Sequence, residues 1–200
     1  MAPLRCFFFV NPALKDETAR DFVALAKAAP EKITIASGGI GSATHLTAEL
    51  FQARTGIKLV HVPFRGAGPA MNDLVAGHVQ SAFTTLATAS SVLDRVRALA
   101  IASETRLATR TSIPTFREGG IDLVVEHWWG VLAPVGLPSE IAARLTRDLK
   151  AILDSHEFAT RLAPLGVTAS HASPAQFRAL IESDTARWAD IVKSVGISVP

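Results

Sequence analysis

Residues 37–46 (SGGIGSATHL) combine three glycines, three hydroxyl side chains and one histidine. They follow a β-branched run at residues 33–36 and precede a run that predicts a helix to about residue 54. A strand, a glycine-rich turn and a helix start in this order expose unpaired N–H groups and a partial positive charge. Phosphate or carboxylate is the natural guest of such a turn, and Ser42 is a candidate ligand contact.

The glycine pattern excludes the two common nucleotide-binding loops. No lysine follows the glycines, as a nucleotide P-loop requires. The third glycine of a dinucleotide fingerprint falls at Thr44, so that pattern does not match either. We therefore predict an anion-binding turn and no cofactor.

A small hydrolase is an alternative, because Ser42 and His45 lie three residues apart at the predicted helix start. They are the best pair in the chain for a nucleophile and its base. Against this, a helix-capping role explains Ser42 without catalysis, and no G-x-S-x-G nucleophile elbow occurs.

Two further polar residues end predicted strands. Arg65 follows a strand predicted at residues 58–64 and opens a second glycine-rich turn, RGAGP. Its guanidinium is suited to pair with an anion, although a loop-bracing role stays open. Thr84 lies near the end of a strand predicted at residues 79–85. Because ligands of α/β sheets gather at the carboxyl ends of strands, both are candidate site residues.

Histidine and cysteine spacing does not indicate a metal site. The six histidines form neither an HxH nor an HExxH pattern, so no metal is predicted. The single cysteine, Cys6, excludes an internal disulfide and a cysteine-rich zinc site. His127, which precedes Trp128, is predicted to pack or to form a hydrogen bond rather than to ligate.

The composition of the 200 residues indicates a folded protein with a substantial core, since 48% are hydrophobic. The net charge is +2 and the basic residues are scattered, so nucleic acid is not predicted as a partner. Residues 1–10 hold a short apolar run that predicts a strand. The run is too short for the apolar region of a signal peptide or for a membrane span.

Strands alternate with helices up to residue 103, a pattern typical of a mostly parallel sheet covered on both faces. The predicted strands are 33–37, 58–64, 79–85 and 97–103, and the predicted helices are 16–29 (capped by Asp16), 42–54, 69–77 and 87–95.

An irregular connection at residues 105–120 separates this part from a second pattern. Here the predicted elements are a strand at 123–132, a helix at 139–154 capped by Ser139, a short helix at 157–162, a short strand at 166–170 and a helix at 174–192. The helix at 139–154 is expected to turn Ile141, Leu145, Leu149 and Ile152 inward. With so few strands to receive these helices, some apolar surface is expected to stay exposed.

Several motifs in order resemble the Bug/TctC family of extracytoplasmic solute-binding proteins, some of which serve tripartite tricarboxylate transporters. The motifs are SGGIGSATHL at 37–46, VPFRGAGPA at 62–70, DLVAGHV at 73–79, PTFREGG at 114–120 and WGVLAP at 129–134. The resemblance implies a type II periplasmic-binding-protein fold whose two lobes close on a small carboxylate. It implies backbone amides, hydroxyls and waters as ligands, and as site residues Ser37, Gly38, Gly39, Gly41, Ser42 and Thr44, with His45 supporting the turn.

The resemblance also predicts the domain organisation. Residues 1–11 are expected to be a crossover strand, 12–103 a complete α/β lobe, 104–124 a connection, and 125–200 the C-terminal part of an incomplete other lobe. Family members begin with a signal peptide and a first-lobe segment that this sequence does not show, so an N-terminally truncated chain is expected. The implied partners are a small carboxylate and the transporter's membrane subunits, and the implied location is the periplasm.

Two further functional hypotheses stay open. The first is the ligand-sensing effector domain of a regulator, which shares the fold but would need a helix-turn-helix that the sequence does not show. The second is a truncated product without activity.

Overall fold

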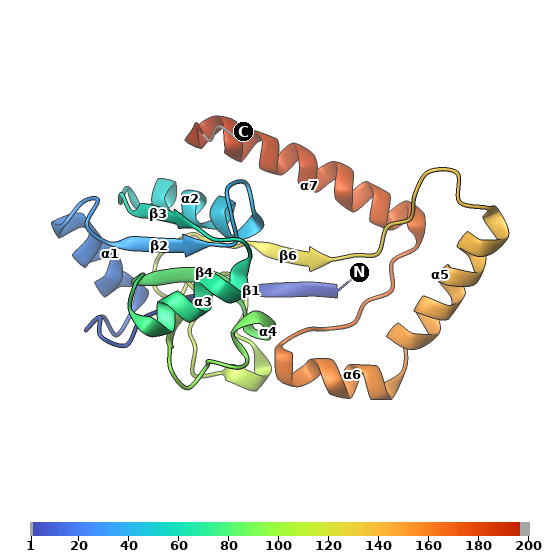
Figure 1. The fold of residues 1–200 in the computed structure, drawn as a ribbon, viewed down its shortest axis with the longest axis horizontal. Helices are drawn as coiled ribbons and strands as arrows, with labels where there is room; N and C mark the ends of the chain where they lie inside the picture. The colour runs from blue at the N-terminus through green and yellow to red at the C-terminus, as the bar shows by residue number, and fades with distance from the viewer. Residues whose placement is uncertain (1, 197–200) are drawn as a thin grey trace.

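Within residues 2–196, which this computed structural model describes, a mixed sheet of six strands lies at the centre of the fold (Figure 1). Five strands lie in the order β3-β2-β4-β1-β5, and β6 pairs with the remaining part of β1. The strands are β1 (Ala2–Val10), β2 (Thr34–Ser37), β3 (Val60–Pro63), β4 (Ser81–Thr85), β5 (Arg97–Ile101) and β6 (Glu126–Trp129).

The central strand β1 runs against every strand with which it pairs. β2 is parallel to β3 and β4, whereas β1 is antiparallel to β4, β5 and β6. The prediction of a mostly parallel sheet is therefore right for β2, β3 and β4 and wrong for the centre. Only parallel neighbours in a βαβ unit need a crossover helix. β1 pairs with β4, β5 and β6, none of which is the next strand in the sequence, so its direction is not constrained in that way.

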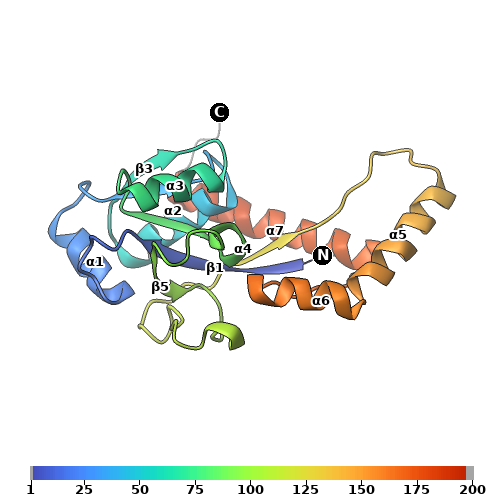
Figure 2. The same cartoon turned by 60° about the horizontal axis from the view of Figure 1, so that its bottom comes forward.

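Helices cover both faces of the sheet, as the alternating pattern predicts (Figures 1 and 2). α1 and α2 pack on one face, and α3 and α4 pack on the other. The helices are α1 (Ala19–Ala28), α2 (Ala43–Thr55), α3 (Ala67–Ala76), α4 (Leu86–Ala89), α5 (Ser139–Leu153), α6 (His156–Leu162) and α7 (Pro174–Val195), with 3-10 turns at Ala108–Arg110 and Ala163–Leu165.

The apolar run at residues 6–10 forms the centre of two cores. Phe8 points into the cluster under α1 and α2, where it meets Phe22 and Phe51. Phe7, on the opposite face of the strand, belongs to the cluster under α3 and α4. All five residues of the run are fully buried, which explains why the run is continuously apolar rather than alternating. The prediction of a strand at this run is confirmed.

Several helix starts differ from the prediction because local capping decides them. α1 is capped by Thr18, which forms a reciprocal capping box with Asp21, and not by Asp16. α3 begins after Gly66, so Pro69 is not its first residue. The helix predicted at 87–95 is only the four-residue α4, capped by Thr85.

The C-terminal third also has shorter elements than predicted. α5 begins at Ser139 itself, with Pro138 as its N-cap residue, so Ser139 does not cap it. The strand predicted at 123–132 is reduced to β6, and the one at 166–170 to a single bridge between Val167 and Leu4. In the described part of the chain these segments pair with β1 alone, so most of their backbone has no neighbouring strand.

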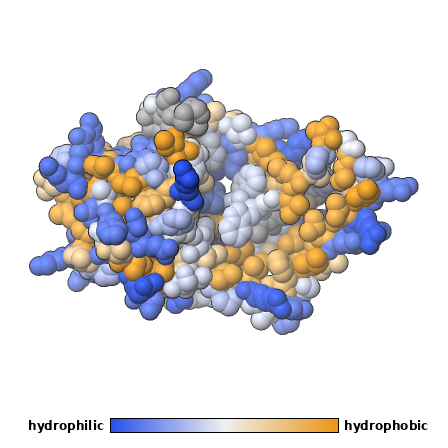
Figure 3. Space-filling model, viewed as in Figure 1, coloured by the Kyte–Doolittle hydropathy of each residue, from blue (hydrophilic) through white to orange (hydrophobic). Residues whose placement is uncertain are grey.

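An apolar face of α5 is exposed. Ile141, Leu145 and Ile152 are 48%, 47% and 50% exposed, so the prediction that they face inward is wrong. α5 packs against α6, and Figures 1 and 2 place both helices away from α1 and α2. Figure 3 shows apolar residues gathered over this end of the molecule. The expectation of exposed apolar surface is confirmed.

α7 returns from this end and packs on α2 (Figure 1). Its Trp188 contacts the core cluster under α1 and α2, and its Asp184 accepts a hydrogen bond of 2.7 Å from Trp128 Nε1. The predicted capping box of Ser173 and Gln176 at the start of α7 is confirmed. None of the helices within residues 2–196 combines the length and apolar character needed to cross a membrane.

Candidate functional site

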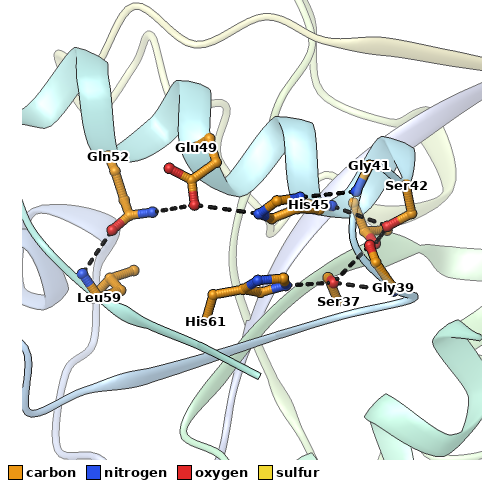
Figure 4. Close-up of polar contacts among 10 residues, drawn as sticks. Ser37, Gly39, Gly41, Ser42, His45, Glu49, Gln52, Leu59 and His61 are labelled. Carbon is orange, nitrogen blue, oxygen red and sulfur yellow. Dashed lines mark hydrogen bonds and ion pairs between the residues drawn. The ribbon is translucent and has the colours of Figure 1, made fainter. Parts of the chain in front are cut away.

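The glycine-rich turn connects β2 to α2 at the carboxyl edge of the sheet (Figure 4). Ser37 is the last residue of β2, and Ser42 is the N-cap of α2, whose hydroxyl accepts from the His45 N–H at 3.3 Å. Gly39 and Gly41 have φ angles of 127° and 73°. Residues with a Cβ rarely adopt such angles, so the turn requires glycine at these two positions.

Most N–H groups of the predicted site residues hold the turn together. The Gly38 N–H donates to Thr44 Oγ1 at 2.9 Å, and the Gly39 N–H to Ser37 Oγ at 3.1 Å. The Gly41 N–H donates to His45 Nδ1 at 3.1 Å. These three glycine amides are therefore not free to bind a ligand in this conformation.

The free donors include the amides of two residues, Ile40 and Ala43, that the sequence analysis did not name, besides that of the predicted Thr44. Within residues 2–196 the N–H groups of Ile40, Ala43 and Thr44 have no hydrogen-bond partner. Ile40 and Ala43 are exposed, and Ala43 and Thr44 are the first two residues of α2. The expectation of unpaired N–H groups at this helix start is confirmed, since the first four N–H groups of a helix have no partner within it.

The second glycine-rich turn packs directly on the first. The Phe64 N–H donates to Ser37 O at 3.0 Å, and the Gly66 N–H to Gly38 O at 3.2 Å. A Cβ on Gly38 would lie 3.2 Å from the Ala67 nitrogen, so a larger residue there would crowd the second turn. Arg65 lies in this second turn and is exposed, next to the predicted site residues but outside the first turn.

Thr84 is brought near the turn but is covered. It lies on β4, two residues beyond the Ala36–Ala82 pair that joins β4 to β2, and is 2% exposed. Thr88, at the start of α4, is only half-buried, and its hydroxyl lies 3.1 Å from Thr85 Oγ1. The spacing of Thr85 and Thr88, a cap and its third residue, is the sequence signal for this pair.

Ser42 and His45 do not form a nucleophile and base. The His45 ring is engaged elsewhere, since Nδ1 accepts from Gly41 and Nε2 lies 3.6 Å from Glu49 Oε1. The Ser42 hydroxyl lies 3.0 Å from Thr44 Oγ1. A catalytic base must reach the proton it removes, and in this geometry the imidazole does not reach Ser42.

Two small cavities lie away from this edge. One, of about 330 Å³, lies between α2 and α7 and is lined partly by Leu50, Arg54 and Trp188. The other, of about 210 Å³, lies beside Arg5 and Ser103. Neither includes a residue of the glycine-rich turn, whose donors lie on an open surface. The unpaired donors of the turn therefore define the candidate site.

The described residues contain no group of three or more His, Cys, Asp or Glu side chains placed to hold a metal ion. The single thiol is also unsuited to chemistry. Cys6 is fully buried in β1, and burial raises its pKa to about 12. A thiol reacts as the thiolate, so this residue has a packing role.

His127 forms a hydrogen bond where α2, β6 and α7 meet, as predicted. Its Nε2 lies 3.1 Å from Thr47 Oγ1 of α2. Burial, then Arg187 of α7, lowers its pKa to about 4, against a smaller opposing effect of Asp184. The ring is therefore neutral at neutral pH.

We expect the free energy of unfolding to fall as the pH drops from about 6.5 toward 4. The pKa values of His61 and His127 are lowered from 6.5 to about 4 in the folded chain. Between pH 6.5 and 4 the unfolded chain binds protons at these two histidines and the folded chain does not, so acid favours unfolding. Above pH 6.5 the histidines contribute a constant amount to the free energy of unfolding. Urea titrations across the window should give a flatter profile for His127→Gln. A profile as steep in this variant as in the native chain would contradict the contribution of His127 to the pH dependence.

Comparison with known proteins identifies the family. A sequence model described as "Tripartite tricarboxylate transporter family receptor" matches residues 2–197. Protein BugT of Bordetella pertussis is 34% identical over 192 residues, which are 93% of this chain and 58% of BugT. A protein of Agrobacterium vitis from the ttuE-ttuC' intergenic region is 31% identical over 189 residues, 92% of this chain and 55% of that protein. The chain thus spans little more than half the length of these curated relatives.

Solved structures agree in fold. R. palustris Rpa4515 with adipate superimposes with a TM-score of 0.95 at 28% identity, over 99% of this chain and 67% of that one. MatC from Rhodopseudomonas palustris with bound malate superimposes with a TM-score of 0.89 at 26% identity, over 96% of this chain and 67% of that one. The predicted α/β periplasmic-binding-protein fold is confirmed, although its sheet is mixed. This chain corresponds to about two thirds of each of these solved chains. Because the family match extends over nearly the whole sequence, the chain belongs to the TctC family of tripartite tricarboxylate transporter receptors.

Proposed function

We propose that this chain binds a small carboxylate at the glycine-rich turn and forms part of a periplasmic receptor that delivers the ligand to a tripartite tricarboxylate-type transporter. The family is one of solute-binding proteins and not of enzymes. The ligand class and the transporter subunits as partners are our proposal for this chain. The unpaired donors of the turn are the observation that carries it.

A carboxylate suits these donors on electrostatic grounds. The N–H groups of Ile40, Ala43 and Thr44 are unpaired in the described structure, and the Ser42 hydroxyl lies beside them. They stand at the start of the 13-residue helix α2, whose first turn holds no acidic residue. The partial positive charge of a helix start therefore meets no internal anion and remains available to a bound one.

The related structures support a dicarboxylate in particular. One relative was solved with adipate and another with malate, and both molecules carry two carboxylates. In our proposal the turn holds one carboxylate, and Arg65, in the second turn that packs on the first, contacts the rest of the ligand. Thr84 then supports this edge from within the sheet.

We also propose that the chain is organised as the family resemblance predicts. Residues 12–103 would form one lobe, and residues 125–200 would contribute to the other. Residues 1–11 and 104–124 would cross between them. Support comes from β1, whose first half pairs with β6 and whose second half pairs with β4 and β5. Ligand binding would then close the lobes across the carboxyl edge of the sheet.

A thermal melt with and without dicarboxylates tests the proposed function. Adipate or malate at about 100 times its dissociation constant is expected to stabilise the chain by about 2.7 kcal/mol. For a chain of this size the melting temperature should rise by roughly 5–10 °C. A matched monoamine such as hexylamine is the control and should cause no shift. A cooperative melt that no dicarboxylate shifts would contradict the proposal for this chain.

A further inference from the structure

Two histidines lie against each other beside the glycine-rich turn, and each contacts one end of it (Figure 4). His45 Nδ1 accepts the Gly41 N–H at 3.1 Å, and His61 Nε2 lies 2.7 Å from Ser37 Oγ. The two rings stack with centroids 3.9 Å apart and planes 11° from parallel. The start and the end of the turn are therefore connected through a pair of imidazoles.

The hydrogen bond from Gly41 selects one tautomer of the neutral His45 ring. An imidazole nitrogen accepts only when it carries no proton, so the proton of the neutral ring must be on Nε2. Nε2 lies 3.6 Å from Glu49 Oε1, which also accepts from Gln52 Nε2 at 2.9 Å. Gln52 in turn accepts from the Leu59 N–H at 2.7 Å, just before β3. α2 thus supplies a carboxylate that favours the tautomer that the turn needs.

His61 is suited to remain neutral beside it. Burial, and then the neighbouring His45, lowers the pKa of His61 to about 4. Two stacked imidazoles at this separation repel each other when both are charged. Within residues 2–196, Glu49 is the one carboxylate that pairs with either ring, so no second anion is present to stabilise a doubly charged pair.

We propose that His45 and His61 are positioning residues that hold the glycine-rich turn in its anion-binding conformation, with Glu49 selecting the tautomer of His45. By accepting the Gly41 N–H, His45 fixes the segment that carries the unpaired Ile40 and Ala43 amides. His61 fixes Ser37, which orders Gly39. The predicted effect on affinity rests on the proposed function, whereas the hydrogen bond to Gly41 can be tested without any ligand.

Two variants of His45 separate positioning from general packing. His45→Asn places an amide oxygen close to the site of Nδ1, so it can still accept from Gly41, whereas His45→Leu cannot. We expect the amide proton of Gly41 to shift upfield in the NMR spectrum of His45→Leu and to return toward the native position in His45→Asn. Adipate affinity should fall by about tenfold in His45→Leu and recover most of that loss in His45→Asn. His78→Leu, at an exposed histidine after α3, is the control and should change neither readout.

The native chain gives a test that does not depend on the folding of a variant. Long-range 1H–15N spectra distinguish the two nitrogens of each histidine, and we expect His45 to carry its proton on Nε2 at neutral pH. The opposite tautomer, or an unchanged Gly41 amide in a folded His45→Leu chain, would overturn the inference. Equal adipate affinities for the Asn and Leu variants would also overturn it. If adipate and malate bind to none of the chains while the Gly41 amide responds as expected, the proposed function fails and the positioning role stands.

Discussion

Replacing Gly39 with valine is expected to abolish dicarboxylate binding while the chain still folds. Gly39 has a φ of 127°, and a Cβ there would lie 3.3 Å from Phe64 O in the second turn. A residue held in such a conformation costs about 1–3 kcal/mol, and a branched side chain also crowds that carbonyl. We expect the turn to rearrange and to displace the Ile40 N–H. Calorimetric titration with adipate, together with a thermal melt, measures both parts of the prediction.

Gly56→Ala is the matched control for Gly39→Val. Gly56 also has a positive φ, 67°, but it ends α2 at the far side from the turn, and no atom lies within 4 Å of its ideal Cβ. The variant should lose stability through backbone strain and keep its affinity. If Gly39→Val bound adipate as tightly as Gly56→Ala does, the turn would not be the binding site.

Replacing Phe8 with alanine is expected to cause the largest loss of stability of any single substitution considered for this chain. Phe8 is fully buried at the centre of an aromatic cluster, with ring centroids 4.8 Å from those of Phe22 and Phe83 and 5.2 Å from that of Phe51. Removing a buried phenylalanine costs about 3–5 kcal/mol, because it loses transfer free energy and leaves a cavity. Urea denaturation followed by circular dichroism measures the loss.

Leu145→Ala provides the comparison for Phe8→Ala. Leu145 is 47% exposed on α5, so its truncation should change the free energy of unfolding by no more than about 0.5 kcal/mol. Nearly equal stabilities of the two variants would mean that β1 is not the central strand of a packed core.

Features that depend on a few neighbouring residues could be predicted from the sequence. The glycine-rich turn at residues 37–42 lies between a strand and a helix, and Ser42 caps that helix, as expected. The capping box of Ser173 and Gln176 was equally recognisable. Interactions within one turn of chain are strong enough to determine these features, so the residue types and their spacing suffice.

The pairing of the amides within the turn could not be predicted in the same way. Gly38, Gly39 and Gly41 were expected to offer their amides, and in the structure these amides donate to Thr44, Ser37 and His45. The N–H groups that stay free are those that the side chains of Ser37, Thr44 and His45 do not reach in the folded turn. The role of His61 depends on the pairing of β2 with β3, which brings it next to Ser37.

The sequence by itself determined the order of most elements, the glycine-rich turn and the strand at residues 6–10, because hydrophobic patterning and capping are local. Only the tertiary structure decided that β1 runs antiparallel and that the exposed apolar surface includes the face of α5 that was expected to point inward. Strand direction depends on partners distant in the chain. An apolar helix face is buried only when another surface is present to cover it, and in the described residues none covers Ile141, Leu145 and Ile152.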